Sequence, residues 1–491
     1  MGIIFILTNF WYNKTIMVKI NKTMFREYDI RGQINNQGFN KKSAELIGKA
    51  FGTYLNRKRI KTIVVGRDYR SYSEELEMAL ICGLSSTGIH IIDIGLCLTP
   101  MLYYAQYYFK SKGGAMITAS HNPNGWSGVK LAADFSKTLQ AKEIQEIYEI
   151  IKSGSFKIGQ GLIEKDHKST HIKEAYTQSA IRRVNIKKPL KVVVECGNGT
   201  ASFFALDILK KAMFASNQVG SEVVELFCKP DWDFPHHIPN PESEEVKKIL
   251  SKKVKQVKAD LGVSFDGDGD RLGVVDELGN NIWSDKLFIL LARQALKGHS
   301  GAKIVFDVKC TRGLAEDIKK HKGIPIMCKT GHSNIKNKIF EEKAILGGER
   351  SGHFFILDNW YGFDDGIFAC LKFLEFLSNQ DKPLSEIIKT IPYWDYLVSP
   401  TLYIFCSDNK KFHIADSLVK EFKKDYGNKK VIDIDGARVE FKNAWGLVRA
   451  SSTQPALTLN FEAKNKQEMK KIKDIFKKKL SKYLKIKQQL S

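Results

Sequence analysis

The chain has 491 residues, 43% hydrophobic and 27% charged, which is ordinary for a soluble protein and suggests about three or four domains of ~100–150 residues. None of the eight cysteines forms a Cys-x-x-Cys pair, which speaks against a zinc knuckle or a disulfide scaffold and predicts a cytoplasmic location. The formal net charge of +23 would suit nucleic acid or an anionic membrane, but lysines spread over solvated helix faces account for it, so we expect neither partner.

The chain opens with an apolar and aromatic stretch, residues 2–12. It lacks the basic start of a signal peptide and is shorter than the ~20 residues that span a bilayer. We expect translation to start at Met17 or Met24, residues 1–16 to be an N-terminal extension, and no segment to cross a membrane.

The first block, residues 17–166, alternates helical and strand patterns. Tyr28 and Arg31 come just before Gly32, in a loop that suits the binding of an anion or a hydroxyl group. Apolar spacing predicts helices at about 44–54 and 74–85, and buried strands at 63–65 and 89–94. This alternation indicates a βαβ unit and a parallel sheet.

Ser120 lies in the polar stretch Ile-Thr-Ala-Ser-His-Asn-Pro, residues 117–123. These residue types also favour an ordinary turn. The Gly-x-Ser-x-Gly motif of hydrolases is absent, and His121 is adjacent in sequence, so we expect it to be poorly placed as a base for Ser120. With Lys130 nearby, Ser120 can instead carry a phosphoryl group, whose charge of about −1.5 to −2 needs cations and donors around it.

The second block, residues 167–282, begins with a strand at 191–195 and a glycine-rich turn that opens a helix at 201–211. The turn resembles a phosphate loop but lacks Gly-Lys-Ser/Thr, so we interpret it as a strand–helix turn. We expect His236 and His237 to be surface residues and not ligands.

Three carboxylates, Asp266, Asp268 and Asp270, follow the strand at 261–265 at every second position. In extended backbone they project to one side, and their repulsion is relieved by a divalent cation such as Mg²⁺, Ca²⁺ or Mn²⁺. An EF-hand is the alternative, but its turn needs glycine where Arg271 stands. Arg271 would neutralise charge that develops in phosphoryl transfer.

The third block, residues 283–396, places polar residues after several strands. Lys309 and His332 lie in two such loops, and a third loop holds Glu349, Ser351 and His353. Glu349 and Ser351 can grip neighbouring sugar hydroxyls and His353 can move a proton, although each can equally be an ordinary polar loop residue. Asp364 and Asp365 precede a helix and are interpreted as capping residues.

The last block, residues 397–491, carries a polar loop between two strand-like segments. Arg449, Ser451, Ser452 and Thr453 supply a guanidinium, three hydroxyls and backbone N–H groups, which together make a phosphate nest. Apolar residues between 469 and 483 recur at helical spacing and predict a surface amphipathic helix.

The motifs Thr-Ala-Ser-His-Asn-Pro, Asp-Gly-Asp-Gly-Asp-Arg and Gly-Glu-x-Ser-Gly-His, in this order, resemble the α-D-phosphohexomutase superfamily, and most of all its bacterial phosphomannomutase/phosphoglucomutase branch. The resemblance runs from Phe25 to about Ala463. It implies three related mixed-sheet α/β domains and a C-terminal α+β domain around a central cleft. We expect their boundaries at 17–166, 167–282, 283–396 and 397–491.

The resemblance also implies a role for each matched residue. Ser120 would be the catalytic phosphoserine, and its phosphate would bind one Mg²⁺ per chain together with Asp266, Asp268 and Asp270. The proton transfer and charge stabilisation would involve Arg31, Lys130, Arg271 and His353. The substrate contacts would be Tyr28, Lys309, His332, Glu349 and Ser351, and the loop for the non-reacting phosphate would be Arg449, Ser451, Ser452 and Thr453.

The sequence departs from the family pattern at two site positions. Ser452 stands where the family usually has asparagine, and Arg350 stands where the nearest branch commonly has methionine. A serine still donates one hydrogen bond, so we expect phosphate binding to survive.

The implied activity is a Mg²⁺-dependent phosphohexomutase that interconverts hexose 1-phosphate and 6-phosphate of mannose, glucose or both. A phosphoserine and a hexose 1,6-bisphosphate, which also serves as activator, would carry the reaction. Phosphoglucosamine mutase and, further away, a Mg²⁺-dependent sugar phosphatase are the alternatives, and a non-catalytic basic binding protein is a third class. We expect hexose phosphates as the partners and a monomer or dimer.

Overall fold

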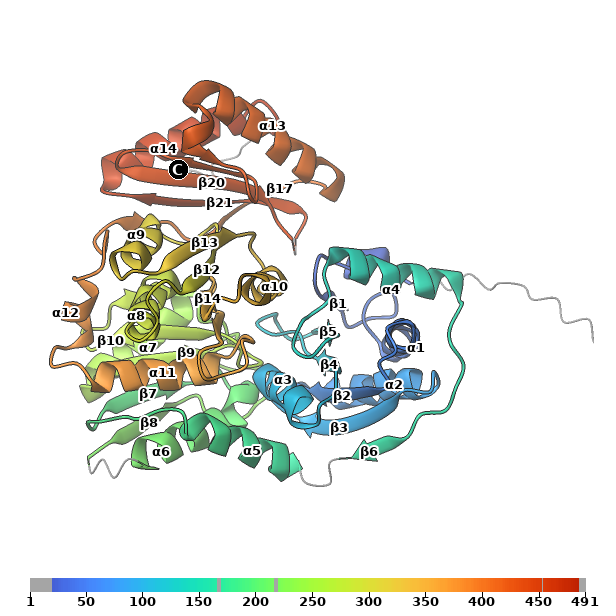
Figure 1. Ribbon diagram of the computed structural model, residues 1–491. Coiled ribbons are helices and arrows are strands. Elements are labelled where there is room, and N and C mark those ends of the chain that lie inside the picture. The colour runs from blue at the N-terminus through green and yellow to red at the C-terminus, as the bar shows by residue number, and fades with distance from the viewer. Residues whose placement is uncertain (1–19, 166–168, 216–219, 453, 485–491) are drawn as a thin grey trace, which may run out of the picture.

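The computed structural model describes residues 20–165, 169–215, 220–452 and 454–484, so the predicted extension at 1–16 lies outside the described residues. The described strands form four sheets that the chain builds one after another (Figure 1). We call the parts built on these sheets the first, second, third and fourth units.

The first unit has a six-stranded sheet in the order β1-β5-β4-β2-β3-β6. Alternation along β2 points Ile63 and Val65 to a core shared with α1, α2 and α4, and Val64 to the opposite face, where α3 packs. The elements are η1 (Lys22–Met24), β1 (Ile30–Gln33), α1 (Lys41–Arg57), β2 (Thr62–Arg67), α2 (Ser73–Ser85), β3 (His90–Leu96), α3 (Thr99–Tyr108), β4 (Gly113–Ile117), β5 (Trp126–Ala132), α4 (Ala141–Ser153) and β6 (Ile163–Lys165).

The second unit has a five-stranded sheet in the order β11-β10-β9-β7-β8. The predicted glycine-rich turn does join strand β7 to helical structure, first a short 3-10 helix and then α6. The elements are α5 (Ser169–Ile181), β7 (Lys191–Glu195), η2 (Thr200–Phe203), α6 (Ala205–Ala215), β8 (Glu222–Leu226), α7 (Glu244–Val257), β9 (Leu261–Phe265), β10 (Leu272–Asp276) and β11 (Asn281–Ile282).

The third unit has a four-stranded sheet in the order β13-β12-β14-β15. Asp365 caps helix α11 by accepting a hydrogen bond from the Phe368 N–H at 2.8 Å, as predicted. The same prediction for Asp364 is wrong, because its buried carboxylate pairs with Lys336 Nζ at 3.0 Å. The elements are α8 (Ser284–Leu296), β12 (Lys303–Asp307), α9 (Arg312–Lys320), β13 (Ile324–Cys328), α10 (His332–Glu342), β14 (Leu346–Gly348), β15 (Phe354–Ile356), α11 (Gly366–Ser378) and α12 (Leu384–Ile388).

One strand arrangement recurs in these three units. In each, two strands pair in parallel with a central strand, and a fourth strand runs antiparallel to one of them. The repeated orders are β3-β2-β4-β5, β8-β7-β9-β10 and β13-β12-β14-β15. The three units are therefore structurally related, which confirms the predicted mixed-sheet α/β class.

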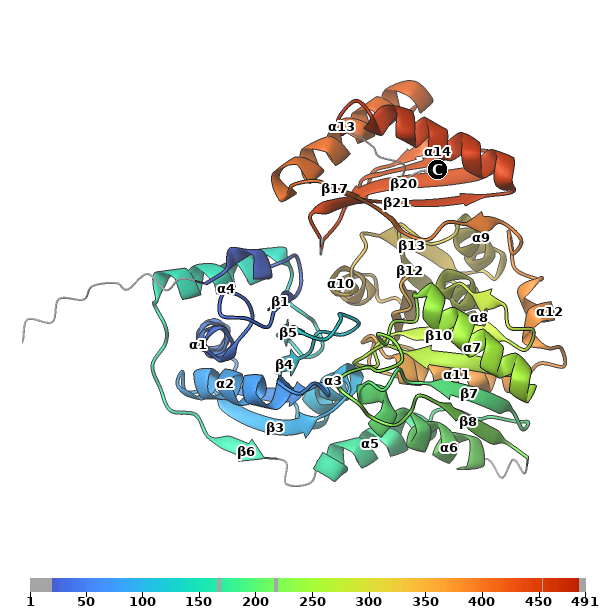
Figure 2. The ribbon, with the colours of Figure 1, turned by 180° about the vertical axis from the view of Figure 1, so that it is seen from behind.

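The fourth unit is an antiparallel sheet in the order β16-β21-β20-β19-β18, with β17 also paired to β21. Helices α13 and α14 cover the face turned away from the third unit (Figures 1 and 2), and Ile472, Phe476 and Leu480 of α14 are buried as the amphipathic pattern predicts. The elements are β16 (Leu397–Val398), β17 (Leu402–Phe405), α13 (Asp408–Tyr426), η3 (Asn428–Lys430), β18 (Val431–Ile432), β19 (Ala437–Glu440), β20 (Ala444–Ala450), β21 (Ala456–Ala463) and α14 (Lys466–Leu480).

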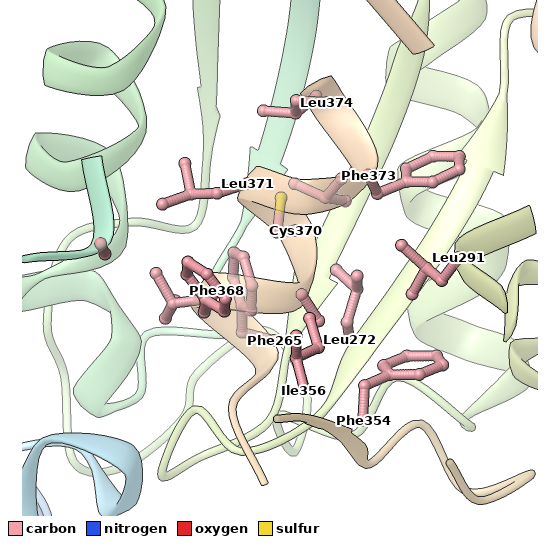
Figure 3. Packing of buried hydrophobic residues seen from close by; sticks show 14 of the residues in the cluster. Phe265, Leu272, Leu291, Phe354, Ile356, Phe368, Cys370, Leu371, Phe373 and Leu374 are labelled. Atoms are coloured by element: carbon pink, nitrogen blue, oxygen red, sulfur yellow. The ribbon is translucent and has the colours of Figure 1, made fainter. Parts of the chain in front are cut away.

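One hydrophobic core joins the first three units. Helix α11 lies at its centre, where Phe368, Leu371 and Phe373 pack among Phe265 and Leu272 of the second unit and residues of the third (Figure 3). Burial of this apolar surface holds the units together and so fixes the loops that extend from their sheets. Among the described residues, no helix combines the length and the apolar character needed to cross a bilayer.

Candidate active site

A cleft of about 810 Å³ lies where the four units meet. Its walls contain every predicted site residue that the structure describes, apart from Asp266, Asp268 and Asp270, which are fully buried. The predicted residues that line it are Tyr28, Arg31, Ser120, Lys130, Arg271, Lys309, His332, Glu349, Ser351, His353, Arg449, Ser451 and Ser452. Thr453 lies outside the described residues.

Four loops supply most of these side chains, and each joins two antiparallel strands. In the first three units the loop occupies the same position of the repeated arrangement: β4 to β5, β9 to β10, and β14 to β15. In the fourth unit the loop joins β20 to β21. We call them the serine, aspartate, sugar and phosphate loops, residues 118–125, 266–271, 349–353 and 449–455, and the phosphate loop includes the last two residues of β20.

Ser120 is held in an unusual backbone conformation. Its φ of +50° lies in the left-handed region, which costs a non-glycine residue conformational energy. The Thr118 hydroxyl accepts from the Ser120 N–H at 2.8 Å, and the buried Arg70 guanidinium donates to Ser120 O at 3.1 Å. These contacts aim the Ser120 hydroxyl at Asp266, whose Oδ2 accepts from Oγ at 2.7 Å.

The prediction that His121 is poorly placed near Ser120 is wrong. Ser120 Oγ lies 3.1 Å from His121 Nδ1, within hydrogen-bonding distance. The left-handed backbone at Ser120 brings the two adjacent side chains together. Burial, with help from Arg271 and Arg31, holds the pKa of His121 well below its usual range, so the imidazole is neutral at pH 7.

The three aspartates form a compact, buried group of oxygens. One oxygen or more of each lies within 4.8 Å of the others. Among the described residues, Asp268 Oδ1 is buried without a hydrogen-bond partner, and Asp270 Oδ1 has only the ion-pair contact of His353 Nε2 at 3.3 Å. Burial and the charges of Asp270 and Asp268 raise the pKa of Asp266 well above its usual range. Carboxylates that repel one another and leave an oxygen unpaired fit a hard divalent cation such as Mg²⁺.

Lys130 neutralises part of this acidic group. Its Nζ donates to Asp268 Oδ2 at 2.8 Å and to Asp270 Oδ2 at 2.5 Å. Burial alone would lower the pKa of Lys130, but Asp268 and Asp270 raise it above its usual range. Lys130 is therefore an ammonium ion beside the predicted metal ligands.

The sugar loop presents two hydrogen-bonding groups to the cleft. Glu349 Oε1 accepts from the Gly331 N–H at 2.5 Å, and Glu349 Oε2 accepts from Ser351 Oγ at 3.3 Å. Although burial would raise it, the pKa of Glu349 lies well below its usual range because of His353 and Lys309. Glu349 is thus an ionised acceptor, which suits sugar hydroxyl groups.

His353 lies between two carboxylates. Its Nδ1 is 3.1 Å from Glu349 Oε2, and its Nε2 is 3.3 Å from Asp270 Oδ1 and from Arg271 Nε. Burial lowers the pKa of His353, but Asp270 and Glu349 outweigh burial and Arg271 and raise it to about 9. His353 therefore carries a proton at pH 7.

Other predicted residues complete the walls through ion pairs. Asp29 accepts from Arg31 NH2 at 2.8 Å and lies 3.4 Å from His332 Nε2, and Tyr28 packs edge-on against His332 with ring centroids 4.9 Å apart. Lys309 Nζ lies 3.3 Å from Asp307 Oδ2. Arg31 and Lys309 are thus each paired with a carboxylate while they border the cleft.

The phosphate loop is centred on Arg449. Its NH2 donates to Ser452 Oγ at 2.9 Å, and its Nε donates to Asp435 Oδ2 at 2.7 Å. Lys411 Nζ donates to the carbonyl oxygens of Ser451 and Gln454 at 2.7 and 3.1 Å, which stabilises the turn of the loop. The departure at Ser452 thus keeps a polar contact with the guanidinium.

Several residues around the site carried no sequence signal. Arg70 supports the serine loop, and Glu242 lies 3.4 Å from Arg271 NH1 at the cleft wall. The expectation of a surface His237 is wrong: the side chain is buried, with Nε2 3.3 Å from Glu195 Oε1. Each lies in a polar stretch without a distinctive pattern, and only its partner in the folded chain reveals its role.

Four family models match consecutive parts of the chain. They describe phosphoglucomutase/phosphomannomutase α/β/α domains I, II and III at residues 22–158, 170–279 and 283–393, and the C-terminal domain at 406–479. Each region contains one of the four loops.

Known proteins resemble most of the chain. It is 40% identical to phosphomannomutase/phosphoglucomutase of Pseudomonas putida, over 92% of this chain and 94% of that protein. It is 38% identical to phosphoglucomutase of Neisseria gonorrhoeae, over 94% and 97%. The crystal structure of a phosphoglucomutase/phosphomannomutase family protein from Burkholderia thailandensis, 35% identical, has a TM-score of 0.85 and covers 94% of this chain and 98% of that one.

Proposed function

Because the chain belongs to the phosphoglucomutase/phosphomannomutase family and is a phosphohexomutase, we propose that it interconverts the 1- and 6-phosphates of glucose and mannose through phospho-Ser120. The bond between Ser120 Oγ and phosphorus breaks as a free hydroxyl of the hexose monophosphate takes the phosphoryl group. The resulting 1,6-bisphosphate turns in the cleft and returns its other phosphoryl group to Ser120. The isomeric monophosphate then leaves.

The cofactor in this proposal is one Mg²⁺, held by Asp266, Asp268, Asp270 and an oxygen of phospho-Ser120. The close grouping of the three carboxylates and the buried Asp268 Oδ1, which has no hydrogen-bond partner among the described residues, support this set. The bound cation would offset negative charge on the transferring phosphoryl group. Added hexose 1,6-bisphosphate would phosphorylate Ser120 and so activate the protein.

Proton transfer is proposed to involve groups on both sides of Ser120. Lys130, with Arg31 or His353 helping, is proposed to handle the proton on the substrate side. As an ammonium ion it protonates the substrate oxygen that leaves when Ser120 takes up a phosphoryl group, and the free amine that results then takes the proton of the hydroxyl that attacks phospho-Ser120. His121, which is neutral and 3.1 Å from Ser120 Oγ, is proposed to take the Ser120 proton after the hydroxyl turns from Asp266 toward it as that oxygen receives a phosphoryl group, and to return the proton when phospho-Ser120 gives the group up. Arg271, the last residue of the aspartate loop, stabilises charge in the transfer.

The two ends of the substrate are proposed to be held by different loops. Arg449, with Ser451, Ser452 and Thr453, holds the non-reacting phosphate in either orientation, so this loop recognises phosphate and not sugar. Glu349 and Ser351 bind hydroxyls that both orientations share, while Tyr28, Lys309 and His332 contact the substrate. If those hydroxyls are on C3 and C4, the loop does not distinguish the configuration at C2, and both mannose and glucose phosphates fit.

The observation that carries the proposal is the position of Ser120 Oγ, 2.7 Å from Asp266 and facing the cleft. We expect Ser120→Ala to lower turnover by about 10³-fold or more, because no other group takes the phosphoryl. After incubation with glucose 1,6-bisphosphate, mass spectrometry of the wild-type protein should place a phosphate on Ser120. Normal turnover by Ser120→Ala would refute the phosphoserine.

The substrate range needs a separate assay. Mannose, glucose and glucosamine 1-phosphates would be offered singly, with Mg²⁺ and a trace of hexose 1,6-bisphosphate. We expect the first two to become 6-phosphates without release of inorganic phosphate. A preference for glucosamine 1-phosphate would change the substrate, and phosphate release that matches substrate loss would mean a phosphatase.

The domain boundaries 17–166, 167–282, 283–396 and 397–491 stay part of the proposal, as do a monomer or dimer and a cytoplasmic location. The four sheets and the matched regions support the boundaries. The free cysteines of the described chain support a reducing compartment.

A further inference from the structure

Asp435 joins the third and fourth units beside the cleft. Its Oδ2 accepts a hydrogen bond from Arg449 Nε at 2.7 Å and another from the Thr330 N–H at 3.1 Å. Arg449 belongs to the fourth unit and Thr330 to the third. One carboxylate oxygen thus fixes the phosphate-loop arginine against a loop of the neighbouring unit.

The turn that carries Asp435 is built to lie against Arg449. Gly436 has a φ of +81°, and a Cβ there would lie 2.2 Å from Val448 O and 2.8 Å from Arg449 Cα. Only glycine permits this close approach of the two backbones. Asp435 is therefore placed by a rigid turn, and its side chain is only 16% exposed.

The other partner of Asp435 leads to the sugar loop. Thr330 and Gly331 present consecutive N–H groups, the first to Asp435 and the second to Glu349 Oε1 at 2.5 Å. The Thr330 hydroxyl donates to Asp307, which also pairs with Lys309. Arg449 and Glu349 are thus connected through two neighbouring amides of one short loop.

We propose, on the basis of the roles proposed for Arg449 and Glu349, that Asp435 is a positioning residue of the mutase. It orients the Arg449 guanidinium and sets the distance between the phosphate loop and the sugar loop. This distance must suit two orientations of the substrate, because the sugar and its phosphate bind the same two loops before and after the bisphosphate turns. Asp435 touches neither reacting atom.

The charge of Asp435 and the position of its oxygen have opposite effects on the binding of phosphate by Arg449. Its negative charge weakens the attraction of Arg449 for a phosphate, whereas its oxygen holds the guanidinium in place. The substitution Asp435→Asn keeps one side-chain oxygen for both donors but removes the charge. The substitution Asp435→Ala removes the oxygen as well. The pair of variants therefore separates positioning from electrostatics.

We expect Asp435→Ala to raise KM for glucose 1-phosphate and for glucose 6-phosphate by about tenfold, with kcat within about threefold of wild type. Asp435→Asn should restore KM to within about threefold. Asp435→Ala should also need more added glucose 1,6-bisphosphate to sustain turnover, because an intermediate held loosely escapes before it turns. Steady-state rates, measured with a titration of glucose 1,6-bisphosphate, give KM, kcat and the bisphosphate requirement of each variant.

Asp433→Asn is the matched control, because Asp433 lies in the same turn and pairs with Lys423 at the exposed surface. It should leave KM and the bisphosphate requirement unchanged. Circular dichroism and thermal unfolding of every variant check the fold. Asp435→Ser, whose side chain is too short to accept from both donors, replaces the alanine variant if that variant does not fold. An unchanged KM in Asp435→Ala, or an equal rise in KM in both variants, would overturn the positioning role.

Arg449→Ala separates this inference from the proposed function, and alanine is chosen because lysine would keep the positive charge. If Arg449→Ala leaves KM unchanged, Arg449 does not bind the phosphate and the proposed role of the phosphate loop fails. If Arg449→Ala raises KM but Asp435→Ala does not, the phosphate loop stands and the role of Asp435 fails.

Discussion

Arg350 stands between Glu349 and Ser351 in the sugar loop, yet its guanidinium points away from the cleft. It packs over the Trp283 ring, 5.0 Å from the centroid, and donates to the carbonyl of Ser399. It is absent from the residues that line the cleft. The departure from the family pattern at this position therefore lies behind the loop.

We predict that Arg350→Met leaves sugar preference as it is. The ratio of kcat/KM for mannose 1-phosphate to that for glucose 1-phosphate should change by less than about twofold, because the side chain does not reach the sugar. Wild type and variant would be assayed with both substrates under saturating Mg²⁺. A tenfold change in the ratio would show that Arg350 takes part in the choice of sugar.

Glu77 of α2 lies outside the cleft, and we expect it to make the stability of the fold depend on pH. Its Oε2 pairs with Arg67 Nε at 2.9 Å, but burial and the nearby Asp93 raise the pKa of Glu77 to about 8. The unfolded chain loses this proton near pH ~4.3. Folding therefore becomes less favourable as pH rises from about 4.5 to about 8, and the penalty is constant above that.

Glu77→Gln should remove this penalty. We expect the variant to gain stability over wild type at pH 9, by up to about 5 kcal/mol, and to gain much less at pH 5. Urea unfolding at both pH values measures the difference. Glu74→Gln is the control, since Glu74 lies on the same helix and pairs with the same arginine but is exposed. An equal gain at both pH values would contradict the buried, protonated Glu77.

The four site loops show what the sequence could predict at the scale of elements. Each loop is a contiguous run of chemically distinctive residues after a buried strand, so its residues were visible from the chain alone. Its neighbours were not, because Asp435 and Thr330 are 105 positions apart and Arg350 and Ser399 are 49 apart. Such contacts depend on how whole units pack.

Two errors about histidines have the same origin. His121 was expected to be poorly placed near Ser120 because adjacent residues usually diverge, and the left-handed φ of Ser120 reverses this. His237 was expected at the surface, but Glu195 at the end of β7 gives it a buried partner. The backbone conformation of Ser120 sets the position of His121, and a long-range pair sets that of His237. Neither feature leaves a pattern in the sequence.

The serine and aspartate loops meet at a glycine, which gives a prediction about these elements. A Cβ at Gly267 would lie 2.4 Å from Ser120 O, a backbone atom that Arg70 also holds. We expect Gly267→Ala to push the loops apart and lower kcat by about 10²-fold, because small displacements of reacting groups are costly.

Mutase rates at saturating Mg²⁺ and glucose 1,6-bisphosphate measure this effect. Gly298→Ala is the matched control, because a Cβ there meets nothing within 4 Å. Circular dichroism should show both variants folded. Full activity in Gly267→Ala would mean that the two loops tolerate separation.

In the whole molecule, the fourth unit is fixed to the third far more firmly than to the first. The buried Arg438 donates to the carbonyl oxygens of Val308 and Cys310 at 2.7 and 2.6 Å and lies 4.0 Å from the Trp445 ring centroid. Toward the first unit, Arg26 NH1 pairs with Asp408 Oδ2 at 3.0 Å across the cleft. The cleft therefore opens most easily between the first and fourth units.

Arg26→Ala should favour the open form of the cleft without unfolding the protein. The Arg26 and Asp408 side chains are 25% and 43% exposed, and such a pair is worth about 0–1 kcal/mol. That limits the loss of the closed form, and the rise in KM for hexose phosphates, to about fivefold. Small-angle X-ray scattering should show a larger radius of gyration, and Arg26→Lys should restore both quantities.

The salt dependence distinguishes two explanations of the Arg26→Ala effect: loss of this ion pair and loss of a direct contact between Arg26 and the substrate. If the pair closes the cleft, raising NaCl to about 0.5 M screens it in the wild type, so the two proteins converge in radius of gyration even without substrate. Arg57→Ala, which breaks an exposed pair with Glu146 inside the first unit, should change neither quantity. A KM effect with an unchanged radius of gyration would assign Arg26 to substrate binding, since closure alone cannot raise KM without moving the fourth unit.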